Sequence, residues 1–183
     1  MINVIIVHGT GGSPEGNWFP WLKHELEKVG YKVFVPKFPT IKNQFLENWL
    51  KTIKKYEKYL DKNSIVVGHS LGVAFLLNII EKLGNPIKSA FFVSGFLRLE
   101  NNLEVNKSFT DRDFDWIKIN KNCKNFCVFH SDNDPYIPLE KAKEFAKNLG
   151  TSIIVVKNAG HINQEAGYTK FELLLDMMKK DMR

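Results

Sequence analysis

The chain has 183 residues, 44% of them hydrophobic, which predicts one substantial core and a single domain over residues 1–183. The formal net charge is +6, but arginine occurs only at Arg98, Arg112 and Arg183 and the lysines alternate with glutamates on helix faces, so we expect no nucleic-acid partner. The first apolar run begins at Asn3, and no run approaches the roughly 20 apolar residues of a membrane span, which predicts a cytoplasmic protein without a signal peptide or membrane contact.

The first predicted strand, residues 3–7, ends in the glycine-rich loop His8-Gly9-Thr10-Gly11-Gly12. A dinucleotide-binding G-x-G-x-x-G motif would need glycine where Pro14 stands, and the second predicted strand, 32–36, is not followed by the acidic residue that would hold a ribose. We instead expect the backbone N–H groups of this loop to be able to approach an oxyanion. An ordinary surface turn is the alternative.

Two helices with apolar stripes are predicted over residues 21–29 and 45–60. Trp18 lies between the glycine loop and the first of these helices, which makes it a candidate for the wall of a substrate pocket.

The stretch Gly68-His69-Ser70-Leu71-Gly72 stands between a β-branched apolar run, residues 64–67, and a helix-length apolar segment, residues 73–83. This is the G-x-S-x-G pattern, in which small residues allow a sharp strand-to-helix turn that presents the serine hydroxyl. Ser70 is therefore the predicted nucleophile, and a capping serine on a glycine-lined turn is the alternative. His69 lies beside this site and is a second candidate pocket residue.

A fourth strand is predicted at residues 90–94, and an irregular segment follows at 95–116. Because long loops in compact domains are often functional, we expect this segment to form the substrate-side wall, with Phe96 and Trp116 as candidate pocket residues. The alternative is an ordinary connection that carries a short helix.

Two further strands, 126–129 and 153–156, run into loops that contain Asp132, Asp134 and His161. Six strands alternating with helices predict an α/β fold with a mainly parallel sheet, whose carboxyl edge would bring these loops to Ser70. The chain order serine, aspartate, histidine is the order of α/β-hydrolases. His161 is the predicted base and Asp134 the favoured carboxylate, with Asp132 as the alternative. Cys123 and Cys127 are too few for a disulfide scaffold and are expected to be buried free thiols.

The sequence resembles the small serine hydrolases of the retinoblastoma-binding-protein-9 type, a compact branch of the α/β-hydrolase superfamily. The resemblance covers nearly the whole chain and is carried by residues 17–28, the elbow at 68–72, Ser108-Phe109-Thr110 with Trp116, Asp134-Pro135 and Gly160-His161. It implies a three-layer α/β-hydrolase core without a cap domain, strand order 2-1-3-4-5-6, and no metal or organic cofactor. It also implies Ser70 as nucleophile, Asp134 as acid and His161 as base. The leucine-x-cysteine-x-glutamate motif of retinoblastoma binding is absent, so that partner is not expected.

These patterns together predict a hydrolase that cleaves a small-molecule ester, thioester or amide through an acyl-enzyme. The backbone N–H groups of Leu71 and Thr10 are the expected oxyanion donors. Two alternatives stay open: an acyltransferase that uses the same site, and a non-catalytic interaction module on a hydrolase fold.

Overall fold

The strands form one sheet in the order β2-β1-β3-β4-β5-β6, and every neighbouring pair is parallel. The computed structural model describes residues 2–99 and 102–181, so residues 100–101 of the expected substrate-side wall lie outside the description. The strands are β1 (Asn3–Val7), β2 (Lys32–Phe34), β3 (Ile65–His69), β4 (Ile87–Val93), β5 (Cys123–Ser131) and β6 (Ile153–Val156). The α/β class and the strand order are both confirmed.

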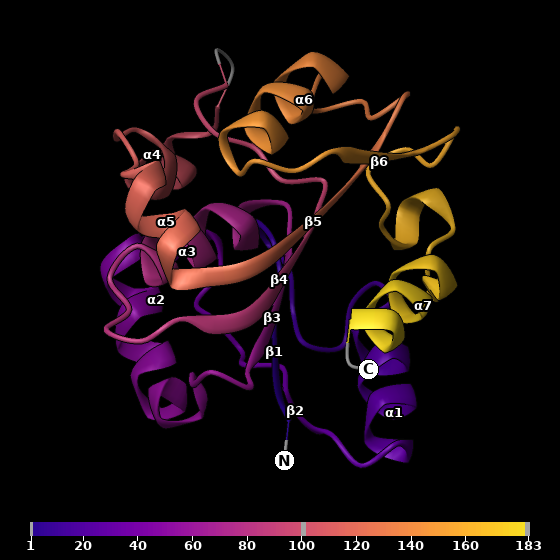
Figure 1. Cartoon of the computed structure of the whole chain (residues 1–183). Helices are drawn as coiled ribbons and strands as arrows, with labels where there is room; N and C mark the ends of the chain where they lie inside the picture. Colours follow the sequence, from indigo (N-terminus) through magenta and orange to yellow (C-terminus); the bar gives the residue numbers. More distant parts are fainter. Residues whose placement is uncertain (1, 100–101, 182–183) are drawn as a thin grey trace.

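Helices cover both faces of this sheet (Figure 1). Two of them, α1 (Phe19–Lys28) and α7 (Glu172–Asp181), lie together on one face. The other face packs against α2 (Leu46–Ile53), α3 (Leu71–Ile80), α4 (Glu104–Thr110), α5 (Trp116–Asn122) and α6 (Leu139–Asn148). Short 3₁₀ helices occur at η1 (Ile41–Asn43), η2 (Lys54–Tyr59) and η3 (Gln164–Ala166).

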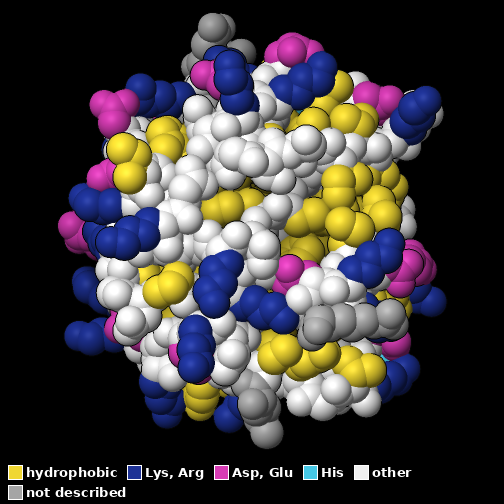
Figure 2. Space-filling view, viewed as in Figure 1, with side chains coloured by type: hydrophobic (Ala, Val, Ile, Leu, Met, Phe, Trp, Pro, Cys, Tyr) yellow, Lys and Arg dark blue, Asp and Glu magenta, His cyan; other side chains and the backbone are white. Residues whose placement is uncertain are grey.

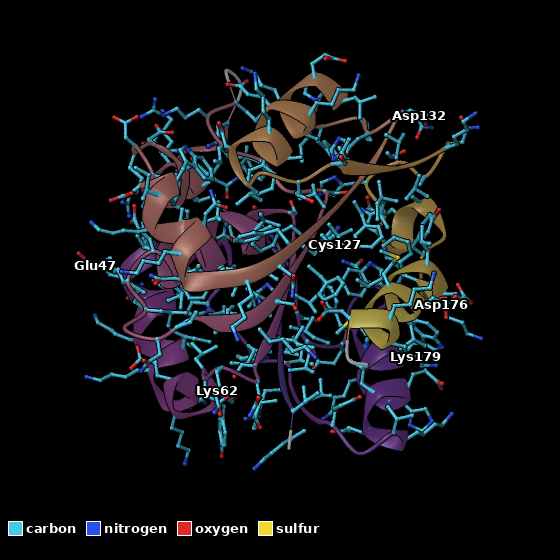
Figure 3. All side chains as sticks on the ribbon, in the orientation of Figure 1. Glu47, Lys62, Cys127, Asp132, Asp176 and Lys179 are labelled. Carbon is cyan, nitrogen blue, oxygen red and sulfur yellow. The ribbon has the colours of Figure 1, made fainter. Side chains whose placement is uncertain are left out.

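Side chains point alternately to the two faces of the sheet along each strand, so the buried residues form two hydrophobic clusters, one on each face. In β1, Ile5 and Val7 join the cluster under α3, whereas Val4 and Ile6 join the cluster under α1 and α7. All four side chains are fully buried, as expected for a parallel strand covered on both faces. In Figure 3, Lys62 and Asp176 extend outward while Cys127 lies within the layers.

Several predicted elements differ in extent, and β4 and β5 both begin three residues before their predicted starts. The helix expected over 45–60 is α2 followed by η2, in which Tyr56 and Tyr59 both pack on Phe34, because residues three apart are eclipsed in a 3₁₀ helix. The second strand ends at Phe34, before Pro36, which has no N–H for a sheet hydrogen bond. The segment 95–116 carries α4 and the first residue of α5, so it is a connection with short helices.

Candidate active site

Ser70 stands between the end of β3 and the start of α3, with φ 54° and ψ −122°. A positive φ is uncommon for a residue other than glycine and marks a strained turn. The turn also needs glycine on both sides. A Cβ at Gly72 would lie 2.5 Å from the carbonyl oxygen of Val7, and one at Gly68 would lie 3.0 Å from the backbone of Val73. The close approach of α3 to β1 at Gly72 and to β3 at Gly68 thus explains why the G-x-S-x-G residues are small.

Asp134 and His161 are hydrogen-bonded, with 2.8 Å between the carboxylate Oδ2 and the imidazole Nδ1. The side chain of Asp134 is fully buried, and its Oδ1 accepts the backbone N–H groups of Tyr136 at 2.9 Å and Ile137 at 3.1 Å. Burial alone would raise the pKa of Asp134, but the hydrogen bond and charge of His161 and these two N–H groups lower it overall. The carboxylate is therefore ionised at neutral pH, so Nδ1 of His161 is the donor and Nε2 is free to accept a proton.

Asp132 has a different role in the same loop. Its Oδ1 accepts the backbone N–H of Asn158 at 2.7 Å. The neighbouring Ser131 Oγ and Asn133 Oδ1 accept the N–H groups of residues 159 and 160 at 2.9 and 2.8 Å. These bonds fasten the loop that carries His161 to the end of β5. The structure thus brings Asp134, and not Asp132, to the imidazole of His161.

Two buried histidines fix the backbone around this pair. His69 Nε2 lies 3.0 Å from the carbonyl oxygen of His161, and the two rings are 5.0 Å apart. Burial, with the charge of His161, lowers the pKa of His69 to about 3, so His69 is neutral and donates this bond. His130 Nε2 lies 3.0 Å from the carbonyl oxygen of Ile137, across the turn that carries Asp134, and burial lowers its pKa as well.

The first loop lies directly against the nucleophile. A Cβ at Gly9 would be 2.7 Å from Ser70 Cβ and 3.2 Å from Ser70 Oγ. His8 fixes the loop through both ring nitrogens. Its Nε2 accepts the N–H of Phe38 at 3.2 Å, and its Nδ1 donates to the carbonyl oxygen of Gly9 at 2.9 Å. The backbone next to Gly9 is therefore held within reach of a group bound to Ser70.

Most of the expected pocket residues are buried. Trp18 is 0% exposed and donates its indole N–H to the carbonyl oxygen of Ile162 at 3.0 Å. His69 and Phe96 are 3% and 5% exposed, and Trp116 packs against other aromatic side chains of the α5 and α6 region. Trp18 is therefore a core residue and not part of a pocket wall, as aromatic side chains of this size commonly are. Trp116 is half-buried, and a pocket role for His69, Phe96 and Trp116 stays a prediction.

Sequence reasoning missed Tyr136, whose side chain does lie at the open side of the site. It is 61% exposed, and its ring is perpendicular to that of His161 with 5.1 Å between centroids. Its position two residues after Asp134 was the only available signal.

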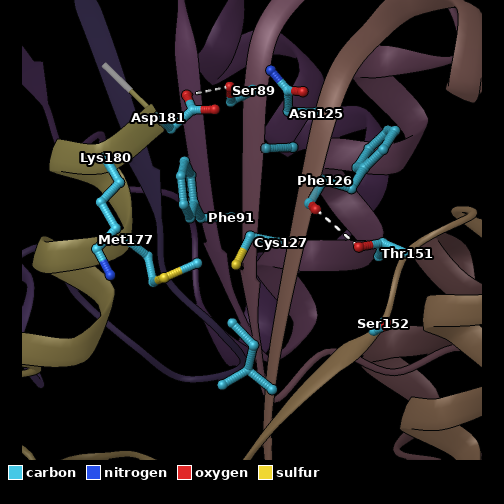
Figure 4. Close-up of a pocket in the computed structure, with 12 residues that line it drawn as sticks. Ser89, Phe91, Asn125, Phe126, Cys127, Thr151, Ser152, Met177, Lys180 and Asp181 are labelled. Carbon is cyan, nitrogen blue, oxygen red and sulfur yellow. Dashed lines mark hydrogen bonds between the residues drawn. The ribbon is translucent and has the colours of Figure 1, made fainter. Parts of the chain in front are cut away.

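The structure also contains a cavity at a distance from these residues. It lies between α7 and the strands β4, β5 and β6, and is lined by Phe91, Phe126, Cys127, Ile154 and Met177 among others (Figure 4). Hydrophobic side chains gather on this face, where β6 and α7 lie (Figure 2). Ser70, Asp134 and His161 instead follow the carboxyl ends of β3, β5 and β6, so the cavity is not part of their site.

Neither a metal-binding cluster nor a membrane-spanning helix occurs among the described residues. Within residues 2–99 and 102–181, no cluster of three or more histidine, cysteine, aspartate or glutamate side chains could hold a metal ion. In the same ranges, no helix has both the length and the apolar character needed to cross a bilayer.

The parallel sheet and the strained serine turn define an α/β-hydrolase core, and the described residues contain no cap domain. A sequence profile described as Serine hydrolase matches residues 4–180, and the chain belongs to this family of enzymes. YdeN of Bacillus subtilis (strain 168) is 30% identical over 177 residues, which cover 96% of this chain and 93% of YdeN.

Structural comparison agrees with this assignment. The crystal structure of the ydeN gene product from B. subtilis matches with a TM-score of 0.93, covering 99% of this chain and 98% of that chain at 30% identity. A second sequence relative is the serine hydrolase RBBP9 of Rattus norvegicus, which is 25% identical over 179 residues that cover 96% of this chain and 92% of RBBP9. Est1E from Butyrivibrio proteoclasticus shares the fold, with a TM-score of 0.75 at 16% identity over 100% of this chain and 90% of that chain.

Proposed function

We propose that this serine hydrolase cleaves a small ester, thioester or amide through a Ser70-His161-Asp134 triad and an acyl-enzyme intermediate. The observation that carries the proposal is the 2.8 Å hydrogen bond between His161 and a buried, ionised Asp134, at the sheet edge where the strained Ser70 turn stands. This arrangement leaves the far nitrogen of His161 free for a proton, as a general base requires.

In the first half of the reaction, Ser70 Oγ attacks the substrate carbonyl carbon while His161 Nε2 takes the hydroxyl proton. The resulting imidazolium is stabilised by the carboxylate of Asp134. When the tetrahedral intermediate collapses, His161 gives this proton to the leaving alcohol, thiol or amine, and an ester to Ser70 remains. Water then attacks that ester with the same proton transfers, which releases the acid and restores Ser70.

The oxyanion of each tetrahedral intermediate needs hydrogen-bond donors. We assign this role to the backbone N–H groups of Leu71 and Thr10, neither of which has an acceptor among the described residues. Leu71 is the first residue of α3, so its N–H also lies at the positive end of a ten-residue helix. Loss of one such donor costs about 3 kcal/mol of transition-state stabilisation.

A fluorophosphonate probe tests the nucleophile. We expect it to label the wild type at Ser70, as located by mass spectrometry, and not to label Ser70→Ala. Ser94→Ala is the matched control, because Ser94 also follows a strand, has φ 50° and is buried, and this variant should label normally. Folded wild type that takes up no probe, or labels elsewhere, would refute the proposal. Hydrolysis of p-nitrophenyl acetate by the same proteins, with and without added alcohol, separates hydrolysis from acyl transfer.

A further inference from the structure

We propose that a buried amide pair, Gln44 and Asn106, positions the first loop so that the N–H of Thr10, and not that of Gly11, faces the oxyanion. This inference rests on the proposed function and adds two positioning residues to it. Gln44 is 0% exposed and Asn106 is 4% exposed. Their amide groups face each other, with 2.8 Å between Gln44 Nε2 and Asn106 Oδ1.

Each amide also bonds to the first loop. Gln44 Oε1 accepts the backbone N–H of Gly11 at 3.1 Å. Thr10 Oγ1 donates to Asn106 Oδ1 at 2.8 Å, so this oxygen receives two hydrogen bonds and both of its lone pairs are used. Two consecutive loop residues are therefore bound by two side chains, one from the residue that follows η1 and one from α4.

Among residues 10–12, the pattern of bonds leaves one backbone N–H unoccupied. The N–H of Gly11 is occupied by Gln44, and the N–H of Gly12 donates to the carbonyl oxygen of Gly9 at 3.1 Å. The N–H of Thr10 has no acceptor in residues 2–99 and 102–181. Because Gly9 contacts Ser70 and Thr10 directly follows it, the unoccupied N–H is adjacent to the nucleophile.

Asn106 is itself held in place. Its Nδ2 donates to Asn102 Oδ1 at 3.2 Å, and Asn102 Nδ2 donates to Thr110 Oγ1 at 2.8 Å. Buried polar groups that are all satisfied form a rigid unit, whereas a partly satisfied set is costly. The network therefore fixes Thr10 before the substrate arrives, which is what an oxyanion donor requires.

Thr10→Val tests the inference with little change of volume, because it removes only the hydroxyl that bonds Asn106. We expect kcat for p-nitrophenyl acetate to fall about tenfold or more while KM stays within about threefold, since the donor acts on the transition state. Thr10→Ser keeps a hydroxyl and should restore kcat to within about threefold of wild type. The matched control is Thr52→Val, a half-buried threonine of α2 whose loss should leave kcat unchanged.

A second readout separates this role from general structural support. A trifluoromethyl ketone adds to Ser70 and forms an oxyanion, so its affinity should fall by the same factor as kcat in Thr10→Val. Amide hydrogen exchange at Gly11 should also become at least about tenfold faster in Gln44→Leu, which removes its acceptor. Unchanged kcat and ketone affinity in Thr10→Val, with turnover by wild type intact, would overturn this inference alone. A folded wild type without turnover would overturn the hydrolase mechanism as well.

Discussion

Replacing Asp134 with asparagine separates the orienting carboxylate from the rest of the site. Oδ1 of Asp134 accepts two backbone N–H groups, from Tyr136 and Ile137, so the asparagine oxygen must stay in that place. The amide NH₂ then takes the place of Oδ2 and faces Nδ1 of His161. Two donors cannot face each other, so His161 must carry its proton on Nε2 and accept at Nδ1.

This tautomer is the wrong one for catalysis, because Nε2 can no longer take the proton of Ser70. The corresponding change in a serine protease lowers kcat by about 10⁴, or about 5.5 kcal/mol in the activation barrier. We expect a fall of the same order in kcat for p-nitrophenyl acetate. KM should change little, since the backbone hydrogen bonds that shape the Asp134 turn are kept.

Asp132→Asn is the matched control, since Asp132 lies in the same loop and its one hydrogen bond within residues 2–99 and 102–181 is to the backbone of Asn158. An amide oxygen can accept that bond, so activity should stay within about threefold of wild type. The measurement is steady-state kcat and KM at pH 7.5, with circular dichroism as a check of folding. If Asp134→Asn keeps more than a tenth of wild-type kcat, or Asp132→Asn loses as much, the assignment of the carboxylate is wrong.

Three further outcomes are expected. Gly72→Ala should lower the free energy of unfolding in urea by about 1–3 kcal/mol, because its Cβ would lie 2.5 and 2.7 Å from carbonyl oxygens at the end of β1. Gly84→Ala is the control: its Cβ would have no atom within 4 Å, so the loss should be under about 0.5 kcal/mol. Burial raises the pKa of Cys123 and of Cys127 to about 12, so iodoacetamide at pH 8 should modify neither thiol of the folded protein and should not reduce activity. The pKa of Asp134 is lowered on folding, so this carboxylate stabilises the fold above the ordinary aspartate pKa, and its contribution is lost as pH falls through the lowered value. The stability difference between wild type and Asp134→Asn should therefore shrink in acid unfolding, and a constant difference would contradict the shift.

The sequence predicted the features that depend on local pattern. Short apolar runs located all six strands, and the residues that follow them located Ser70, Asp134 and His161. Parallel strands place their carboxyl ends at one edge, so chain position alone indicated which residues would meet. The catalytic roles of these three residues are still predictions, which the experiments above test.

The features that sequence reasoning missed depend on contacts between distant segments. Gln44 bonds a residue 33 positions away and Asn106 one 96 positions away, and no periodicity links these residues to the first loop. Trp18 was misassigned for a related reason. A tryptophan after a glycine loop can face solvent or the core, and its partner, the carbonyl oxygen of Ile162, lies 144 residues away.

The three buried histidines at the ends of β1, β3 and β5 share one arrangement. His8, His69 and His130 each bond a backbone carbonyl oxygen of a loop at the site, those of Gly9, His161 and Ile137. Burial lowers the pKa of each, so all three are uncharged at neutral pH.

The absence of charge on these histidines matters for Asp134. A protonated histidine near this carboxylate would compete with His161 for its charge, and His130 Nε2 is only 3.8 Å from Asp134 Oδ2. Because burial keeps His130 neutral, it can hold the turn through Ile137 without forming a full ion pair. The charge of Asp134 is then left to stabilise the imidazolium that forms on His161, which is the role that the proposed mechanism gives it.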